Sequence, residues 1–303
     1  MNQVTAIDLG SNSFRVLVYD CLNHEVLGEY NEVVGMADGL SHTQNISLEA
    51  QQRVIKAIKN SSEQLSYDPS KAVCVTTAAM RLAKNSQEVL KYIKDEVGAN
   101  FKIIDGQEEA RLTLLAVKYA LKREKINSSK FILLDIGGGS TEIIVNNQDE
   151  FISNSFNFGI VTLTQKYDNY EDLNKELHAH KKDIKNFLEE NNVALDEYTF
   201  VATAGTPTTI AAIKLGQDFF HYDKEAVNGT KIKIKDLDEC LELFRNSSTS
   251  TITKLVGRGR VEFIEVGVYI YKAIFEVLNK KESIVLDDGL REGVAINSCL
   301  FRQ

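Results

Sequence analysis

The sequence predicts an α/β protein with two similar domains, each a mixed β-sheet flanked by helices. Along the chain, short apolar runs of strand length alternate with segments of helical periodicity. One strand–turn–strand pattern also occurs twice, at 4–19 and at 131–145, about a domain's length apart. A chain of 303 residues is long enough to form two cores. Together these observations indicate two similar halves.

The glycine-rich copy of the pattern lies at Phe131–Val145. An apolar strand ends on Asp135 and a second apolar strand follows a turn made of Gly137, Gly138, Gly139, Ser140 and Thr141. Glycines can take positive φ, and they let a ligand approach bare backbone. Successive amide N–H groups in such a turn form an anion site, and the hydroxyls add donors. Taken alone, the run is equally compatible with a tight hairpin whose glycines have a steric role.

The N-terminal copy, Val4–Tyr19, has the same order of features. Asp8 lies near the end of its first strand, and the turn contains Gly10, Ser11, Asn12 and Ser13. Two such hairpins predict two halves that each offer a phosphate-binding turn to a shared cleft. This organisation resembles the actin-like ATPase superfamily of sugar and acetate kinases, heat-shock chaperone ATPases and actin. The resemblance implies two ribonuclease H-like domains with a cleft between them.

Composition places the chain among soluble globular proteins, with 43% hydrophobic and 26% charged residues. The formal net charge of −8 argues against a general nucleic-acid binder, whose surface would be basic. No apolar run is long enough to span a bilayer, and the first strand begins without a basic leader. We therefore expect a cytoplasmic protein that binds neither nucleic acid nor membrane.

The cysteines show no pattern of a metal site or of a disulfide framework. They are four in number, contain no C-x-x-C pair, and stand at Cys21, Cys74, Cys240 and Cys299. In a cytosolic protein, scattered cysteines of this kind are expected to be buried, reduced thiols.

The first half contains further strands and helices. Ser47 is placed to cap a helix that Pro69 ends. Apolar residues recur near helical spacing within it, at Val54, Ile58 and Leu65. The other expected elements are strands at 25–33, 72–76 and 101–104 and a helix from 107 to about 123.

The polar segment 122–130 is the expected boundary between the domains. Domain I is expected to span 1–125, joined by a closing helix at about 288–303, and domain II to span 126–287. In domain II we expect strands at 151–158 and 199–203 and helices at 161–167, 172–191, 237–245 and 262–278. Lys231, Lys233 and Lys235 alternate with isoleucines and indicate a protected edge strand.

A third candidate anion contact follows the strand at 199–203. Thr206 can cap a helix that has Pro207 at its first position. Such a helix start leaves free N–H groups beside Gly205. We therefore expect Gly205 and Thr206 to contact a phosphate or a nucleotide.

Five sequence blocks occur in order, at Thr77–Arg81, Asp105–Arg111, Asp135–Glu142, Ala204–Pro207 and Asp288–Gly293. With them the chain resembles the exopolyphosphatase and guanosine pentaphosphatase (Ppx/GppA) family over nearly its whole length. The resemblance implies Mg²⁺-dependent release of the terminal phosphate of inorganic polyphosphate, or of the 5′ terminal phosphate of pppGpp in the stringent response. Many members carry an added C-terminal helical domain; this chain is similar to the short, two-domain members.

Phosphoanhydride hydrolysis needs an aligned water, a base, and positive charge on the nonbridging oxygens. Glu108 and Glu109 are neighbours on a helix and point to different sides, and the resemblance selects Glu109 as the base. The helix dipole alone also favours acids in a first turn. Arg81 matches the family's arginine, whose planar fork holds two phosphate oxygens. Its alternative role is that of an ordinary surface arginine.

The resemblance assigns Asp135 and Glu142 to Mg²⁺, directly or through water. Glu142 could instead be a solvent-facing strand residue. Asp8 is the pseudo-symmetric candidate, either for positioning the metal or its water or for capping the turn at Gly10.

Basic and imidazole side chains complete the candidates. Arg260 and Arg291 match basic family positions, and the choice between structural and substrate-groove roles stays open for them and for Arg258. His178 and His180 face different directions on a helix, so they predict a solvated helix face rather than a metal pair.

Two rival functions use the same turns. A kinase of the actin-like superfamily would need an Asp base and an acceptor pocket, and a nucleotide-binding sensor or filament protein would need no catalytic Glu109 or Arg81. The sequence does not separate polyphosphate from pppGpp as the substrate. We expect a homodimer only because twofold dimers are the commonest assemblies.

Overall fold

The structure is a computed structural model and describes residues 3–148, 150–167 and 169–301. It confirms the predicted α/β class with two mixed sheets flanked by helices. The chain forms two compact units: unit 1 comprises Met1–Ala116 with Asp288–Gln303, and unit 2 comprises Val117–Asp287. The division falls within helix α5 (Gly106–Arg123), earlier than the polar segment that the sequence indicated. Each unit is described by itself.

The sheet of unit 1 has the strand order β3-β2-β1-β4-β5. Its strands are β1 (Gln3–Leu9), β2 (Ser13–Asp20), β3 (Glu25–Val33), β4 (Val73–Thr76) and β5 (Phe101–Ile103). β1 is antiparallel to β2 and parallel to β4, which is parallel to β5. Leu9, Thr76 and Ile103 lie in register, so the segments that follow them leave the sheet at one edge.

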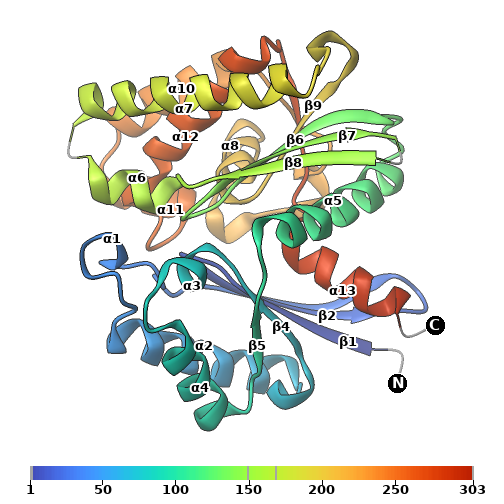
Figure 1. Cartoon of the computed structure of the whole chain (residues 1–303), viewed down its shortest axis with the longest axis vertical. Helices are drawn as coiled ribbons and strands as arrows, with labels where there is room; N and C mark the ends of the chain where they lie inside the picture. Colours follow the sequence, from blue (N-terminus) through green and yellow to red (C-terminus); the bar gives the residue numbers. More distant parts are fainter. Residues whose placement is uncertain (1–2, 149, 168, 302–303) are drawn as a thin grey trace. The chain divides into compact units, whose positions relative to one another are not determined.

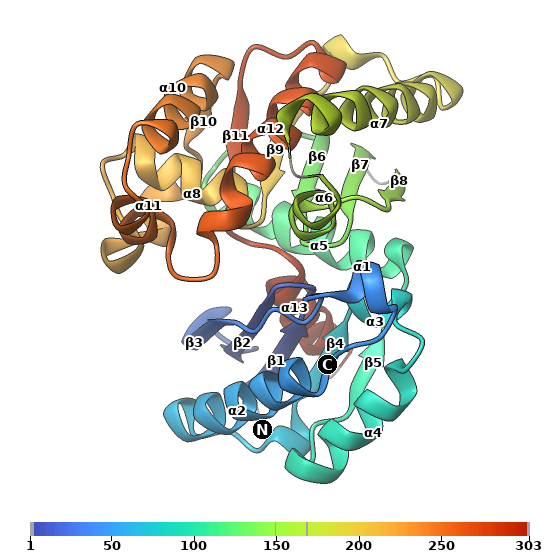
Figure 2. The same cartoon turned by 90° about the vertical axis from the view of Figure 1, so that its left-hand side faces the viewer.

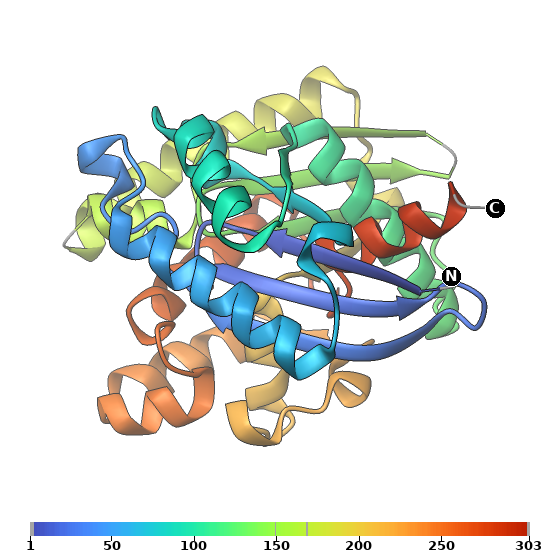
Figure 3. The same ribbon diagram turned by 90° about the horizontal axis from the view of Figure 1, so that it is seen from below.

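Helices cover both faces of this sheet. They are α1 (Leu40–Thr43), α2 (Leu48–Leu65), η1 (Pro69–Lys71), α3 (Ala78–Leu82), α4 (Ser86–Val97) and α13 (Leu290–Leu300), with the first part of α5. Figures 1 and 3 show α2 and α4 on one face, and α13 packs against β1 and β2 on the other. α2 begins as predicted, because Ser47 Oγ accepts from Ala50 N at 3.2 Å. Helix α4 was not predicted.

Arg291 joins α13 to the sheet. Its Nη2 donates to Glu292 Oε1 at 2.6 Å and to Glu29 Oε2 at 2.9 Å, and Nη1 lies 3.5 Å from Val16 O. The side chain is buried. A buried guanidinium needs such charged acceptors, so these contacts give Arg291 a structural role in unit 1.

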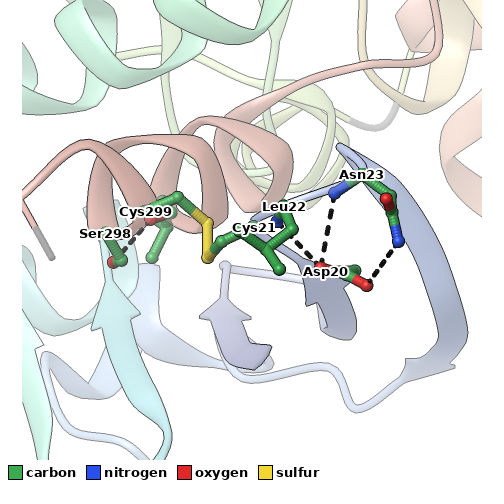
Figure 4. Close-up of a disulfide and its surroundings, with 7 residues drawn as sticks. Asp20, Cys21, Leu22, Asn23, Ser298 and Cys299 are labelled. Atoms are coloured by element: carbon green, nitrogen blue, oxygen red, sulfur yellow. Dashed lines mark hydrogen bonds between the residues drawn. A yellow bond between two sulfur atoms is a disulfide. The ribbon is translucent and has the colours of Figure 1, made fainter. Parts of the chain in front are cut away.

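The prediction of four reduced cysteines is wrong for one pair. Cys21, directly after β2, and Cys299 in α13 form a disulfide that spans 278 residues of sequence (Figure 4). Cys74 and Cys240 are free and buried, as predicted, and burial raises the pKa of each to about 12. The pairing escaped the sequence because it depends on the return of the C-terminal helix to the first sheet.

The sheet of unit 2 has the order β10-β11-β9-β6-β7-β8. Its strands are β6 (Lys130–Ile136), β7 (Thr141–Asn147), β8 (Glu150–Phe156), β9 (Thr199–Thr203), β10 (Lys231–Ile232) and β11 (Ser283–Val285). β6, β9 and β11 are parallel neighbours, and Asp135 lies opposite Thr203. The glycine turn and the start of the helix after β9 therefore follow adjacent strand ends.

The helices of unit 2 are α6 (Ile160–Lys166), α7 (Tyr170–Glu190), η2 (Leu195–Glu197), α8 (Gly205–Lys214), η3 (Phe219–His221), α9 (Lys224–Val227), α10 (Ile234–Arg245), α11 (Thr249–Val256) and α12 (Val261–Leu278), with the end of α5. α12 packs against α6, α7 and β6, and Figure 2 shows α12 beside α7. Aromatic rings fill this core, with Phe200 edge-on to Phe275 at 4.9 Å between centroids.

The predicted edge strand with lysines at 231, 233 and 235 is confirmed only for its first two residues, which form the edge of the sheet, and is wrong for the rest. β10 consists only of Lys231–Ile232, and α10 begins at Ile234 with Lys233 as its N-cap residue. Asp236 Oδ2 accepts from Lys233 N at 2.7 Å, so this local bond starts a helix where the alternation of residues indicated a strand.

His180 does not belong to a solvated helix face. Its ring stacks on Phe158 at 4.0 Å between centroids, whereas His178 on the same helix is exposed. Burial lowers the pKa of His180, although Glu176 acts in the opposite direction.

In the described part of the chain, no helix is both long and apolar enough to cross a membrane.

Breaking the disulfide should destabilise the protein. Cys299→Ser, or reduction, frees a very long loop in the unfolded chain, and we expect a loss of about 2–4 kcal/mol in the free energy of unfolding, measured with urea. Reductant should still lower the free energy of unfolding of Cys240→Ala, which keeps the disulfide, and should not change that of Cys299→Ser, which lacks it. Detection of four thiols instead of two in denatured, unreduced protein would contradict the assignment.

Stability should also depend on pH through His180. Because its pKa is lowered in the fold, the unfolded chain binds the proton more readily near its ordinary pKa of about 6.5, so stability is full above that pH and falls below it. When the pH is lowered from about 7.5 to about 5.5, the melting temperature of His180→Gln should fall by less than that of wild type. His178→Gln is the control and should behave as wild type; equal pH slopes in all three would refute the argument.

Candidate functional site

The two predicted turns have the same backbone geometry. Gly10 N donates to Ser13 O at 2.9 Å, and Gly137 N donates to Ser140 O at 2.9 Å. The strands that flank each turn close with the pairs Leu9–Phe14 and Ile136–Thr141. The repeat inferred from the sequence is therefore a structural repeat, with one copy in each unit.

The glycines of these turns do not take positive φ. Neither Gly10 nor any of Gly137, Gly138 and Gly139 is among the residues with left-handed backbone. Gly137 has a steric role, because a Cβ there would lie 2.9 Å from Ser140 O, and so has Gly159, where a Cβ would lie 2.5 Å from Gly137 O; a Cβ on Gly10 would make only an ordinary contact of 3.5 Å with Ser13 O. The turn of unit 2 thus packs backbone against backbone.

The backbone carbonyl groups of both turns accept hydrogen bonds from backbone N–H groups of a later segment. This segment follows β3 in unit 1 and β8 in unit 2. In unit 1, Ser11 O accepts from Ala37 N at 2.8 Å, and Asn12 O accepts from Val34 N at 2.8 Å. In unit 2, Gly137 O accepts from Ile160 N at 3.0 Å and Gly138 O from Val161 N at 2.9 Å. Hydrogen bonds to the carbonyls fix the peptide planes of both turns.

The amide groups of the turns have no such partners. Among the described residues, no acceptor takes the backbone N–H groups of Ser11, Asn12, Gly138, Gly139 and Ser140. Asn12 is 7% and Ser140 3% exposed, and Asn12 Oδ1 also has no described partner. Buried amide groups require a partner, and fixed amides in succession suit an anion.

The hydroxyl side chains that flank the turns differ in their burial and in their hydrogen bonds. Thr141 Oγ1 donates to Phe158 O at 2.8 Å and is fully buried, so it supports the fold of the turn. Ser13 opens β2 and is half-buried. Thr141 is therefore not placed to donate its hydroxyl to a ligand.

In unit 1, the predicted base Glu109 forms an ion pair with the predicted phosphate-binding Arg81. Arg81 Nη1 donates to Glu109 Oε2 at 2.7 Å and to Ile104 O at 2.9 Å, and Glu109 is buried. α3, which carries Arg81, follows β4, and α5 follows β5, so parallel neighbouring strands deliver the two side chains to the same edge. The pair combines a carboxylate with a guanidinium suited to phosphate.

Glu108 has a different partner, as the helical geometry predicted. Arg111 Nε donates to Glu108 Oε2 at 2.7 Å, and Arg111 Nη2 also donates to Asn297 Oδ1 at 3.0 Å. The hydrogen bond from Arg111 lowers the pKa of Glu108. Glu108 thus belongs to the contact between α5 and α13, and only Glu109 is joined to Arg81.

Asp135 and Glu142 are directly opposite each other in the ladder of β6 and β7. Cross-strand neighbours of this kind have Cβ atoms about 5 Å apart, and like charges there repel. Glu142 is 2% exposed and accepts from Ser155 Oγ at 2.7 Å, so it is not the solvent-facing strand residue considered above. Two adjoining carboxylates, one of them buried, fit a divalent cation.

Asp8 has a different neighbour. It lies opposite Arg15 in the ladder of β1 and β2 and is buried. Within the residues that the structure describes, no three His, Cys, Asp or Glu side chains gather as a metal cluster. At the ladder position where unit 2 has Glu142 opposite Asp135, unit 1 has Arg15 opposite Asp8.

The helix after β9 begins earlier than predicted. α8 starts at Gly205, and its N-cap residue Ala204 has a φ of 74° without a side-chain cap, so Thr206 is not the cap. Thr206 is buried against α12, where a Cβ on Gly267 would lie 2.3 Å from its Oγ1. A left-handed alanine is strained, which marks this strand end as a constrained position.

Arg260 begins helix α12 and lies against an aromatic ring. It is the N-cap residue of α12, and its guanidinium lies 6.0 Å from the Phe219 ring centroid. Arg258 is exposed in the preceding loop. Gly159 and Ser155 were not predicted as site residues, although Gly159 packs against the glycine turn and Ser155 donates to Glu142. The position of Gly159 directly after the predicted strand at 151–158 was the available signal for it.

Comparison with known proteins agrees with this geometry. The model of the Ppx/GppA phosphatase family matches residues 18–301. A guanosine-5′-triphosphate,3′-diphosphate pyrophosphatase of Photobacterium profundum is 30% identical over 298 residues, 95% of this chain and 58% of that protein. The chain spans about half the length of the curated relatives that it matches, 58%, 44% and 57% of the first three.

Solved structures share the fold. The crystal structure of the Ppx/GppA family member of Aquifex aeolicus is 26% identical, has a TM-score of 0.73, and the match covers 99% of this chain and 98% of that one. An exopolyphosphatase of Cytophaga hutchinsonii has a TM-score of 0.79 at 22% identity, with 99% and 98% covered. These likenesses confirm the predicted actin-like fold. Since the family model matches most of the sequence, this chain belongs to the Ppx/GppA phosphatase family.

Proposed function

We propose that the chain hydrolyses the terminal phosphoanhydride bond of a linear phosphate, either inorganic polyphosphate or the 5′ end of pppGpp. The observation that carries this proposal is the pair of turns whose successive amide groups have no acceptor among the described residues. Backbone amides bind phosphate oxygens without regard to the group beyond them. The names of the relatives, a pppGpp pyrophosphatase and an exopolyphosphatase, support this substrate class.

The turns would bind the substrate through its phosphate oxygens. The amides at Ser11 and Asn12 and those of Gly138, Gly139 and Ser140 are the donors, with the N-terminus of α8 at Gly205 as a further one. Because the bonded carbonyls of Ser11, Gly137 and Gly138 fix the peptide planes that hold the amides of Asn12, Gly138 and Gly139, these three need little reorganisation when a phosphate arrives. Thr206 and Thr141 would act through the backbone only, since their side chains are buried in the fold.

Glu109 and Arg81 would carry the chemistry. Arg81 exchanges its ion pair with Glu109 for the oxygens of the terminal phosphate, which releases the carboxylate. Glu109 then takes a proton from water as the water oxygen attacks the terminal phosphorus in line. The P–O anhydride bond breaks, inorganic phosphate is released, and the electron pair stays on the shortened phosphate chain.

Asp135 and Glu142 would hold the metal. Membership of the family implies a divalent metal in general, and we propose Mg²⁺, which prefers oxygen ligands and keeps part of its water shell. Bound Mg²⁺ would neutralise charge on the nonbridging oxygens. The two carboxylates fit this role because a cation relieves their repulsion across the ladder. Asp8, opposite Arg15, would position a metal-bound water.

We also propose a cytoplasmic enzyme that acts in the stringent response when pppGpp is its substrate. The Cys21–Cys299 disulfide weighs against this location, because such bonds are uncommon in a reducing cytosol. A homodimer and the contribution of Arg260 to a substrate groove remain predictions. Transfer of phosphate to an acceptor other than water would indicate the kinase function instead.

Replacing the base should separate binding from turnover. We expect Glu109→Gln to lower the rate of phosphate release by about 10²–10⁴, since the amide cannot accept the proton from water, while substrate affinity changes little. The measurement is phosphate release from long-chain polyphosphate, tripolyphosphate, pppGpp and ATP in Mg²⁺, with equilibrium binding of each in parallel.

Glu108→Gln is the matched control for this replacement. It removes the same charge one residue away from a carboxylate whose partner is Arg111, so its turnover should stay close to wild type. Wild-type phosphate release by Glu109→Gln, or an equal loss in both variants, would eliminate Glu109 as the base.

Metal binding should be visible without turnover. At Mg²⁺ near 100 times its dissociation constant, the free energy of unfolding of wild type should rise by about 2.7 kcal/mol. Glu142→Gln should be insensitive to Mg²⁺, because only one carboxylate remains at the pair. Thermal unfolding with EDTA and with Mg²⁺ measures both.

Glu150→Gln, an exposed acid in the adjoining strand β8, is the control and should respond to Mg²⁺ as wild type does. An undiminished Mg²⁺ response of Glu142→Gln would show that the ion binds elsewhere.

A further inference from the structure

Neighbouring strands of unit 2 place polar side chains in one row across the sheet. Asp135 on β6 lies beside Thr203 on β9 and opposite Glu142 on β7, and Glu142 lies opposite Ser155 on β8. Residues paired in a ladder point to the same face of the sheet. These side chains therefore form a polar row on one face, close to the glycine turn.

The adjoining positions on that face are apolar in the three inner strands. They are Leu133 on β6, Ile144 on β7 and Val201 on β9, and all three side chains are buried. Polar groups at the edge of a buried apolar face cost free energy unless they bond one another or a ligand. The polar row is thus better explained by a site than by packing.

Ser155 holds one oxygen of the Glu142 carboxylate. Ser155 Oγ donates to Glu142 Oε1 at 2.7 Å. Since β7 lies between β6 and β8, Asp135 and Ser155 flank Glu142 from opposite sides. The hydrogen bond directs Oε1 toward β8, so a cation on the side of Asp135 would bind Oε2.

The row reaches the surface on both sides of Glu142. Asp135 and Ser155 are half-buried, whereas Glu142 is 2% exposed. An ion can therefore approach through Asp135, and it would meet the buried carboxylate of Glu142 from one side. This approach favours binding through one oxygen of Glu142.

The number of oxygens that a carboxylate offers distinguishes Mg²⁺ from Ca²⁺. Mg²⁺ needs near-ideal octahedral geometry at about 2.0–2.1 Å, whereas Ca²⁺ takes about six to eight ligands at about 2.3–2.6 Å and often binds both oxygens of one carboxylate. A hydrogen bond to Oε1 competes with binding through both oxygens. A Glu142 held by Ser155 therefore suits the smaller ion.

The same hydrogen bond places Glu142 before an ion arrives. A glutamate side chain has several rotatable bonds, and repulsion from Asp135 favours rotamers that turn its carboxylate away. The bond from Ser155 opposes that movement. Less side-chain freedom is then lost when the ion binds, which raises its affinity.

We propose that Ser155 is a positioning residue that makes the carboxylate pair selective for Mg²⁺ over Ca²⁺, because it holds Glu142 so that only Oε2 binds the ion. The inference rests on the proposed function, since it concerns the metal site assigned there to Asp135 and Glu142. Ser155 acts through Glu142 and touches neither the ion nor the substrate.

The test measures the binding of each ion to the full chain without substrate. The dependence of the free energy of unfolding on the concentration of Mg²⁺ or of Ca²⁺ gives a dissociation constant for each ion. Ser155→Ala should weaken Mg²⁺ binding by about 10–100-fold and Ca²⁺ binding by less, so that the preference for Mg²⁺ falls by about tenfold. Ser155→Thr keeps the hydroxyl and should retain the preference of wild type.

Ser153→Ala is the matched control. Ser153 lies two residues earlier on β8, on the same face and also half-buried, but opposite Ile144. This variant should bind both ions as wild type does. An unchanged preference for Mg²⁺ in Ser155→Ala, or an equal weakening of both ions, would overturn the inference and leave the metal site in place. A wild-type protein that does not respond to Mg²⁺ would overturn the metal site and this inference together.

Discussion

The hydrogen bonds that hold the carbonyl groups of the two turns are the constraint on which the proposed chemistry depends. Ser11 and Asn12 in unit 1, and Gly137 and Gly138 in unit 2, direct their oxygens to backbone N–H groups of the next segment of chain. Their peptide planes are fixed in this way, so the amides of each turn are set before any ligand arrives. An anion site built from backbone needs little from side chains except small size, which is why glycine and serine suffice.

Parallel neighbouring strands bring the candidate catalytic side chains of unit 1 to the same edge of its sheet. In unit 1, β4 and β5 deliver Arg81 and Glu109, which form an ion pair, and in the proposed reaction a phosphate would compete for the guanidinium. The two units are not chemically equivalent, however. The acid before the turn lies opposite Arg15 in unit 1 and opposite Glu142 in unit 2. This difference is the reason that we propose the metal site for unit 2 and the base for unit 1.

Helix α13 supports unit 1 from the end of the chain. Arg291 joins it to Glu29, Arg111 reaches it at Asn297, and the disulfide fixes its last turn beside β2. Arg111 also donates to Glu108, on the side of α5 away from Glu109. Helix α13, which begins about 180 residues after Glu109 in the sequence, thus contacts the same helix α5 that carries the candidate base.

The sequence by itself determined the features that depend on neighbouring residues: the repeated hairpin, the capped start of α2 at Ser47, and the divergence of Glu108 and Glu109. It misjudged Lys233, where one local hydrogen bond outweighed an alternating pattern. Only the tertiary structure decided the pairing of Cys21 with Cys299, the burial of Thr206 against Gly267 and the packing of Gly159 against the backbone of Gly137. Each of these features depends on contacts between segments that are distant in sequence. The pattern of residues within one segment does not specify which distant segment it will contact.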